Sequence, residues 1–126
     1  MKKIVIIEDN QVIQHILRSW FSEEDFQVVS LDSIEGLTNK VRLFKPDLII
    51  TDIMIPNTTA DELITVFNEI HVPIIVISSM DAEDVLFFAA RIDAIGSFTK
   101  PIHLNELFGF IHDFFNNNLN KKASQL

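Results

Sequence analysis

Side chains that could carry chemistry follow four separate apolar runs of this 126-residue chain, each where the run ends. Three are carboxylates, one is a hydroxyl and one is an ammonium: Glu8, Asp9, Asp52, Ser78 and Lys100. Carboxylates held close together repel one another, and a hard divalent cation relieves that repulsion. Mg²⁺ prefers a few carboxylates plus waters, and a Mg²⁺ ion with an open position suits phosphoryl transfer. In that chemistry Asp52 is the nucleophile that forms an acyl phosphate. Ser78 and Lys100 bind the phosphoryl oxygens.

Each of these residues also has an ordinary structural interpretation. Glu8 and Asp9 could be acids at the start of a helix, where the helix dipole favours negative charge. Ser78 could cap a helix and Asp52 could lie in a turn or cap. Lys100 could be a solvated surface residue. Because all four runs end in this way, a shared site explains the pattern better than independent roles do.

The elements that must position these residues are visible in the apolar pattern. Five β-branched or apolar runs predict strands, at residues 3–7, 26–31, 48–51, 74–77 and 95–99. The intervals between them carry apolar residues at helical spacing, such as Ile13, Ile16, Leu17 and Trp20. Runs that are apolar on both faces suit a parallel sheet covered by helices on both sides. We therefore predict an α/β doubly wound sandwich, in which ligands bind at the carboxyl ends of the strands.

Composition limits the classes of function. We expect one domain over residues 1–116, with residues 117–126 a polar C-terminal tail or the start of a linker. The net charge of −8 argues against binding to nucleic acid or to anionic membranes. The absence of cysteine excludes disulfides, cysteine-ligated metals and a cysteine nucleophile. The sequence has no glycine-rich phosphate loop, no signal peptide and no membrane span, so we expect a cytoplasmic protein without a nucleotide cofactor.

Four segments together resemble the receiver domain of two-component response regulators, over residues 1 to about 116: 6–10, 47–56, 73–79 and Lys100-Pro101. The resemblance implies a flavodoxin-like fold, with five parallel strands in the order 2-1-3-4-5 and five helices. It implies that Asp52 accepts a phosphoryl group from a sensor histidine kinase or a phosphotransfer protein. Ser78 and Lys100 would then sense the phosphoryl group. Glu8, Asp9, Asp52 and the backbone carbonyl of Met54 would bind Mg²⁺. It also implies a cis peptide before Pro101.

The resemblance implies a signalling switch rather than a turnover enzyme, one that catalyses only its own phosphorylation and slow autodephosphorylation. A phosphate-independent pseudo-receiver, acting only in protein–protein interaction, is the main alternative. It stays open because Ser97 stands where the family has its switch aromatic, while strand alternation turns Phe98 to the other face. An aspartyl-phosphate phosphohydrolase is disfavoured, because such enzymes need a second Asp where this chain has Met54.

The last two helices suggest an output surface. Residues 82–92 are apolar nearly all round, which fits either a deeply covered helix or an exposed patch for a partner. We expect self-association or effector binding through the face of the fourth helix, fifth strand and fifth helix. We also expect activation to repack this face, with Phe87, Phe88 and Phe110 as the candidates for the bistable element that couples the two.

Overall fold

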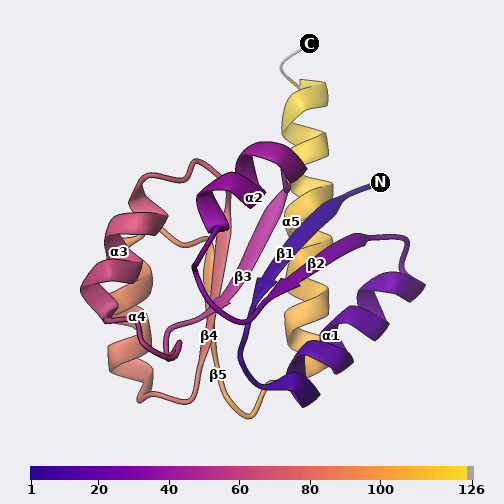
Figure 1. The fold of residues 1–126 in the computed structure, drawn as a ribbon. Helices are drawn as coiled ribbons and strands as arrows, with labels where there is room; N and C mark the ends of the chain where they lie inside the picture. The colour runs from indigo at the N-terminus through magenta and orange to yellow at the C-terminus, as the bar shows by residue number, and fades with distance from the viewer. Residues whose placement is uncertain (125–126) are drawn as a thin grey trace.

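The chain folds into a five-stranded parallel sheet with helices on both faces (Figure 1). The computed structural model describes the backbone of residues 1–124 and the side chains of residues 1–117. The strand order is β2-β1-β3-β4-β5, as the resemblance implies. The strands are β1 (Lys3–Ile7), β2 (Gln27–Leu31), β3 (Leu48–Asp52), β4 (Ile74–Ser78) and β5 (Gly96–Thr99). Every neighbouring pair is parallel, so all five carboxyl ends lie at one edge of the sheet.

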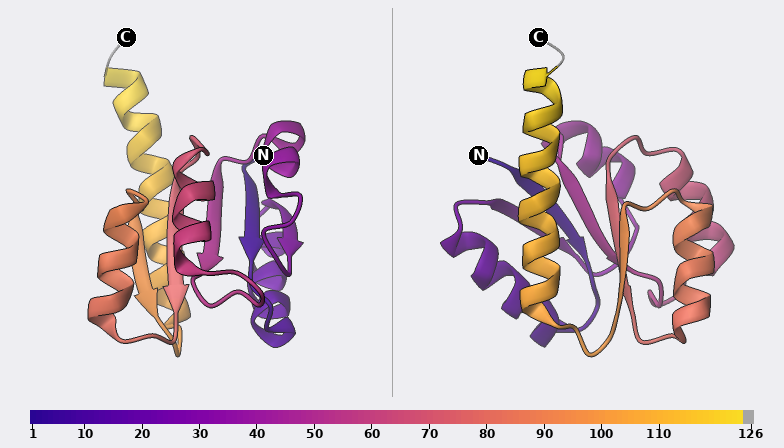
Figure 2. Two further views of the ribbon diagram at one scale, coloured as in Figure 1. Left: turned by 60° about the vertical axis from the view of Figure 1, so that its left-hand side comes forward. Right: turned by 180° about the vertical axis from the view of Figure 1, so that it is seen from behind.

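Two apolar clusters, one on each face of the sheet, hold the helices in place. Alternate residues of β1 divide between them: Val5 and Ile7 contribute to one cluster, and Ile4 and Ile6 contribute to the other. The first cluster packs against α2, α3 and α4, and the second against α1 and α5 (Figure 2). The helices are α1 (Gln11–Glu23), α2 (Leu37–Phe44), α3 (Ala60–Asn68), α4 (Ala82–Arg91) and α5 (Leu104–Ser124).

Helix α1 differs from its predicted apolar stripe. Leu17 and Phe21 are fully buried, whereas Ile16 is 41% exposed. Trp20 is half-buried, and its ring stacks on Phe108 of α5 with 3.6 Å between ring centroids. The stripe is therefore rotated toward Phe21, and Ile16 is left at the surface.

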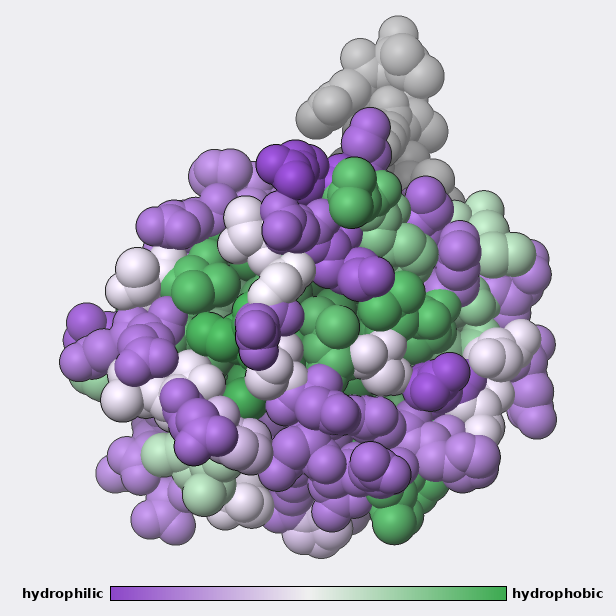
Figure 3. All heavy atoms as spheres, in the orientation of Figure 1, coloured by the Kyte–Doolittle hydropathy of each residue, from purple (hydrophilic) through white to green (hydrophobic). Residues whose placement is uncertain are grey.

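Helices α5 and α2 differ greatly in length. Helix α5 continues to Ser124 and projects past the sheet, so the tail expected from residue 117 is helical as far as the structure describes it (Figure 2). Residues 125–126 of that tail lie outside the described residues. Helix α2 has only 8 residues and covers its face incompletely. Hydrophobic side chains consequently remain visible at the centre of this face, surrounded by hydrophilic ones (Figure 3).

Candidate functional site

The predicted site residues meet at the carboxyl edge of the sheet. Glu8 follows β1, Asp52 ends β3, Ser78 ends β4, and Lys100 follows β5 directly. Glu8, Asp52 and Ser78 are all buried, at 0%, 3% and 0% exposure. Buried polar groups need partners, so the contacts among these residues decide what the site can do.

Lys100 is the centre of the cluster. Its Nζ donates to both carboxylate oxygens of Glu8, at 3.1 and 3.0 Å, and to Oδ2 of Asp52 at 2.7 Å. An ammonium has three protons, so these bonds use its whole donor capacity. Only 16% of the Lys100 side chain is exposed, which rules out the solvated-surface interpretation.

Three carboxylates converge on the same point. Glu8, Asp9 and Asp52 can each place one oxygen within 4.8 Å of the others, which is a spacing that could hold a metal ion. Backbone N–H groups fix two of them: Asn10 donates to Oε1 of Glu8 at 3.1 Å, and Met54 donates to Oδ1 of Asp52 at 3.0 Å. Asp9 is exposed and open to solvent. A hard, partly hydrated cation such as Mg²⁺ fits this all-oxygen donor set.

Burial and charge oppose each other at Glu8 and Lys100. Burial raises the pKa of Glu8 above its usual value; the hydrogen bond from Lys100 opposes this rise and the charge of Asp52 adds to it. Burial alone would lower the pKa of Lys100, but its bonds to Asp52 and Glu8 outweigh burial and raise that pKa. The ammonium is therefore held firmly in its charged form.

Ser78 lies beside the cluster with its hydroxyl engaged elsewhere. Its Oγ accepts the backbone N–H of Met80 at 3.3 Å. Among the described side chains, no hydrogen bond joins this hydroxyl to Asp52 or Lys100. The backbone N–H of Lys100 donates to the Ser78 carbonyl at 2.7 Å, which ties the ends of β4 and β5 together. The Lys100–Pro101 peptide is cis, as expected.

The helix-capping alternative for Ser78 does not hold, whereas Asp52 does close a turn, since its Oδ1 accepts the Met54 N–H. The side chain of Asn10 caps α1 by accepting from the N–H groups of Val12 and Ile13. The residue that precedes α4 at its N-cap is Asp81, so Ser78 caps neither helix. The structure brings Glu8, Asp9, Asp52 and Lys100 together with Ser78 beside them, and Glu8 turns both oxygens to Lys100, which the sequence gave no sign of.

Comparison with known proteins decides the family. The model of the response regulator receiver domain matches residues 4–112. The chain belongs to the response regulator receiver domain family. It resembles transcriptional regulatory protein KdpE of Staphylococcus aureus, with 32% identity over 106 residues, covering 83% of this chain and 46% of KdpE. It also resembles sensory transduction protein BceR of Halalkalibacterium halodurans, with 27% identity over 108 residues, covering 85% of this chain and 47% of BceR. The chain thus spans about half the length of these curated relatives.

Two solved structures share the fold. The receiver domain of the TMAO respiratory system response regulator TorR has a TM-score of 0.81 and 28% identity, covering 93% of this chain and 98% of that one. The N-terminal domain of an uncharacterized protein from Wolinella succinogenes has a TM-score of 0.82 and 27% identity, covering 96% and 99% of the two chains. This receiver domain has, over its described residues, no helix both long and apolar enough to cross a membrane.

Strand β5 carries no aromatic residue on its α4 side. Ser97 pairs in register with Val76, whereas Phe98 packs in the cluster beneath α1 and α5. Phe98 makes an edge-to-face contact with Phe110 of α5, with 5.6 Å between centroids. Phe110 also lies against Gly96, where an added Cβ would be 2.7 Å from the ring. Phe110 is therefore half-buried and packs on two residues of β5.

Helix α4 carries apolar residues on its outer face as well as on its buried face. Phe88 is only 4% exposed and belongs to the core beneath this helix. Leu86 and Phe87 are 61% and 66% exposed, and the guanidinium of Arg91 lies 5.4 Å from the Phe87 ring. The helix is not deeply covered, and its outer face presents an apolar pair.

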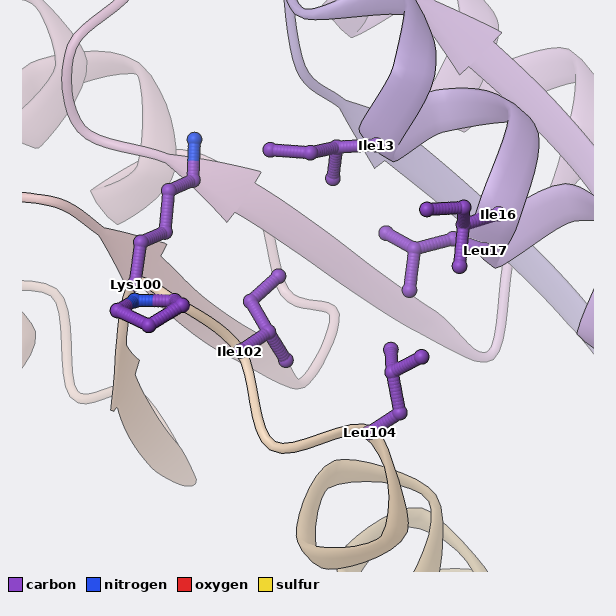
Figure 4. A pocket seen from close by; sticks show the side chains of 7 residues that line it. Ile13, Ile16, Leu17, Lys100, Ile102 and Leu104 are labelled. Atoms are coloured by element: carbon purple, nitrogen blue, oxygen red, sulfur yellow. The ribbon is translucent and has the colours of Figure 1, made fainter.

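Two hollows lie near the carboxyl edge of the sheet. One, of about 520 Å³, is lined by residues that follow Asp52, among them Met54, and by Met80; the Ser79 hydroxyl donates to the Met54 sulfur at 3.6 Å. The other, of about 210 Å³, is apolar and lies between α1 and the segment after β5 (Figure 4). Figure 4 shows Ile13, Ile16 and Leu17 facing Ile102 and Leu104, with Lys100 at one end.

Proposed function

We propose that this receiver domain accepts a phosphoryl group on Asp52 from the phosphohistidine of a sensor histidine kinase or a phosphotransfer protein. The observation that carries the proposal is the Lys100 ammonium, which lies 2.7 Å from Oδ2 of a buried Asp52 at the carboxyl edge of the sheet. The carboxylate oxygen attacks phosphorus, the P–N bond to histidine breaks, and an acyl phosphate forms on Asp52. The electron pair of the broken bond leaves with the imidazole.

The residues around Asp52 have separate roles in this transfer. Glu8, Asp9, Asp52 and the Met54 carbonyl would hold Mg²⁺, which supplies charge neutralisation at the phosphoryl oxygens when it is bound. Lys100 provides a counter-charge for a phosphoryl oxygen. Ser78 donates its hydroxyl to another oxygen, using a proton that its present bond to Met80 leaves free, since Oγ is the acceptor in that bond.

The domain works as a switch that modifies itself. Its chemistry is limited to its own phosphorylation and a slow hydrolysis of the acyl phosphate. Water must approach phosphorus in line with the bond that breaks, and Met54 and Met80 line the hollow formed by residues that follow Asp52. Neither thioether orients water strongly, which favours a long-lived phosphorylated state.

The test of this function is labelling by a small phosphodonor. Wild-type protein incubated with acetyl phosphate and Mg²⁺ should gain one phosphoryl group, whereas Asp52→Asn should gain none because an amide is a poor nucleophile. Asp93→Asn is the matched control, since Asp93 is an exposed acid at the end of α4. Undiminished labelling of Asp52→Asn would move the acceptor elsewhere. A wild type that is never labelled by acetyl phosphate or by phosphorylated kinases would support the pseudo-receiver instead.

Two surfaces suit the partners that this function requires. The apolar hollow between α1 and the segment after β5 adjoins Lys100, and Ile16 stands exposed beside it. A kinase seated there brings its phosphohistidine close to Asp52. The outer face of α4, with Leu86 and Phe87, suits self-association or an effector.

The α4 surface has its own test. Phe87→Ser should weaken any association that appears on phosphorylation. Leu43→Ser is the control, because Leu43 is an exposed apolar residue on another helix, α2. Sedimentation of the beryllofluoride-treated proteins measures the effect. Equal association of wild type and Phe87→Ser would exclude this face.

A further inference from the structure

We propose that Gln14, in the first turn of α1, is a positioning residue for Asp9, because its side-chain amide holds the peptide group that joins Glu8 to Asp9. This inference rests on the proposed function, since it assumes that Mg²⁺ binds at the carboxylate cluster. Gln14 itself contacts neither the metal nor the phosphoryl group in this role. The loop between β2 and α2 takes part as well, because the same amide also binds Asp32, the residue after β2.

The Gln14 amide bridges the ends of two neighbouring strands. Its Nε2 donates to the backbone carbonyl of Glu8, which follows β1, and to Oδ1 of Asp32 at 2.7 Å. A primary amide has two N–H protons, so both are used in these bonds. A carbonyl and an ionised carboxylate can only accept. A side chain of the same length without N–H groups therefore cannot replace the glutamine.

The bond to the Glu8 carbonyl fixes where Asp9 begins. The peptide group between the two residues is planar, so holding its oxygen also sets the direction of the Asp9 N–H and Cα. Among the hydrogen bonds of the described residues, only the one from Gln14 reaches this carbonyl. Asp9 is exposed, and within residues 1–117 no ion pair holds its carboxylate. The backbone, rather than a side-chain contact, must therefore direct Asp9 toward the cluster.

The groups that the amide joins are themselves well fixed. The backbone N–H of Gln14 donates to the carbonyl of Asn10 at 3.0 Å, and the Asn10 side chain caps α1. The backbone N–H of Glu8 donates to the carbonyl of Leu31 at 3.1 Å, directly before Asp32. The amide thus closes a connection between α1, the end of β1 and the loop after β2. Asp9 then loses little backbone freedom when a cation binds, and such preorganisation strengthens binding.

Asp32 acts as an anchor for Gln14 rather than as a further metal ligand. It directly follows β2 at the same edge of the sheet, but it is not among the carboxylates of the described residues that can gather within 4.8 Å of one another. Its Oδ1 accepts from the Gln14 amide instead. The role needs an acceptor oxygen and not a negative charge, so asparagine should serve at this position.

Titration with Mg²⁺ alone, followed by nuclear magnetic resonance, tests the inference on wild type, Gln14→Met and Gln11→Met. Gln14→Met keeps the length of the side chain but removes both N–H groups. It should bind Mg²⁺ about tenfold more weakly, the lower end of the loss when a group that orients a metal ligand is removed. In the metal-free protein the carbonyl-carbon signal of Glu8 should move upfield, because its oxygen has lost a donor. Gln11→Met makes the same change at an exposed glutamine of α1 and should stay within about twofold of wild type.

A pair of variants at Asp32 keeps the inference testable if Gln14→Met fails to fold. Asp32→Asn and Asp32→Leu remove the same charge, but only asparagine keeps an acceptor for the Gln14 amide. Asp32→Leu should therefore bind Mg²⁺ about threefold more weakly than Asp32→Asn, as expected for one lost hydrogen bond. Asp32 is exposed, so both variants should fold.

Phosphorylation by acetyl phosphate gives a readout that a general loss of structure would not. Gln14→Met should need about tenfold more Mg²⁺ to reach half of its maximal rate, while its rate at saturating Mg²⁺ approaches that of wild type. A partly unfolded protein would lose maximal rate instead.

Failure of this inference can be told apart from failure of the proposed function. Equal Mg²⁺ affinity of wild type and Gln14→Met, or of the two Asp32 variants, would overturn the role of the Gln14 amide and leave Asp52 as the phosphoryl acceptor. If the wild type itself bound no Mg²⁺ at tens of millimolar, the metal in the proposed function would fail, and the role of Gln14 with it.

Discussion

Replacing Lys100 with methionine should destabilise the metal-free protein strongly at neutral to alkaline pH. Methionine keeps the apolar stem of the side chain but removes the ammonium that three carboxylate oxygens accept from. Glu8 has no exposure and Asp52 only 3%, so neither can replace that partner with bulk water. The perturbation is thus the loss of a charge partner rather than a loss of packing.

The magnitude follows from the burial of the pair. Removing one partner of a buried ion pair costs about 3–5 kcal/mol. The cluster is open to solvent near exposed Asp9, so we expect the cost of Lys100→Met at the lower end of this range, at about 3 kcal/mol near pH 8. Saturating Mg²⁺ should restore much of the loss, because a ligand that binds only the folded state stabilises it.

The free energy of unfolding that Lys100→Met loses should become smaller as the pH falls. Burial already raises the pKa of Glu8 in the folded state, and without Lys100 nothing opposes that rise except the Asn10 N–H. In Lys100→Met the folded chain holds the Glu8 proton more tightly than the unfolded chain does. The variant therefore gains stability as pH falls through the range between the folded and unfolded pKa values of Glu8, and loses it as pH rises through that range. The deficit of Lys100→Met relative to wild type should therefore be largest at about pH 8 and smallest at about pH 5.

Urea unfolding followed by Trp20 fluorescence measures this deficit. Trp20 is the only tryptophan and stacks on Phe108 across α1 and α5, so its emission reports global unfolding. Lys45→Met serves as the control for the change in net charge. Equal stability of Lys100→Met and wild type at pH 8, or a deficit that grows toward pH 5, would refute the reasoning.

Three further predictions address lifetime, packing and recognition. Met54→Asn combined with Met80→Glu should speed hydrolysis of the acyl phosphate roughly tenfold, about 1.4 kcal/mol of barrier, and an unchanged rate of phosphate release would contradict this. Gly96→Ala should cost about 1–3 kcal/mol in thermal unfolding, because its Cβ would lie 2.7 Å from the Phe110 ring. Adding Phe110→Leu should remove most of the clash, and strictly additive losses would argue against it. Ile16→Asp should slow phosphotransfer from any histidine kinase that labels wild type, while labelling by acetyl phosphate stays the same; slowing of both reactions would point to a disturbed site instead.

The sheet and the position of the site could be predicted from the sequence because they depend on local patterns. Runs such as Ile4–Ile7 are apolar on both faces, and only a strand buried between two helical layers accommodates them. Residues that directly follow such runs must lie at one edge of a parallel sheet. Glu8, Asp52 and Lys100 each stand at the end of such a run, so their place at this edge follows from the sequence.

Contacts between distant segments could not be predicted in the same way. Phe87 and Phe88 are neighbours of the same residue type, and only the rotation of α4 about its axis makes one exposed and the other buried. The place of Phe110 depends on a glycine in β5 that leaves room for its ring. The bond between Glu8 and Lys100 spans 92 residues and depends on side-chain reach at the sheet edge, which no local pattern encodes.

Mapping the phosphorylated residue is the sharpest test of Asp52 as the phosphoryl acceptor. After incubation with acetyl phosphate and Mg²⁺, borohydride converts an acyl phosphate into the corresponding alcohol, which peptide mass spectrometry locates in the sequence. We expect reduction at Asp52 alone. A modification at Glu8, Asp9 or another acid, with Asp52 untouched, would contradict it.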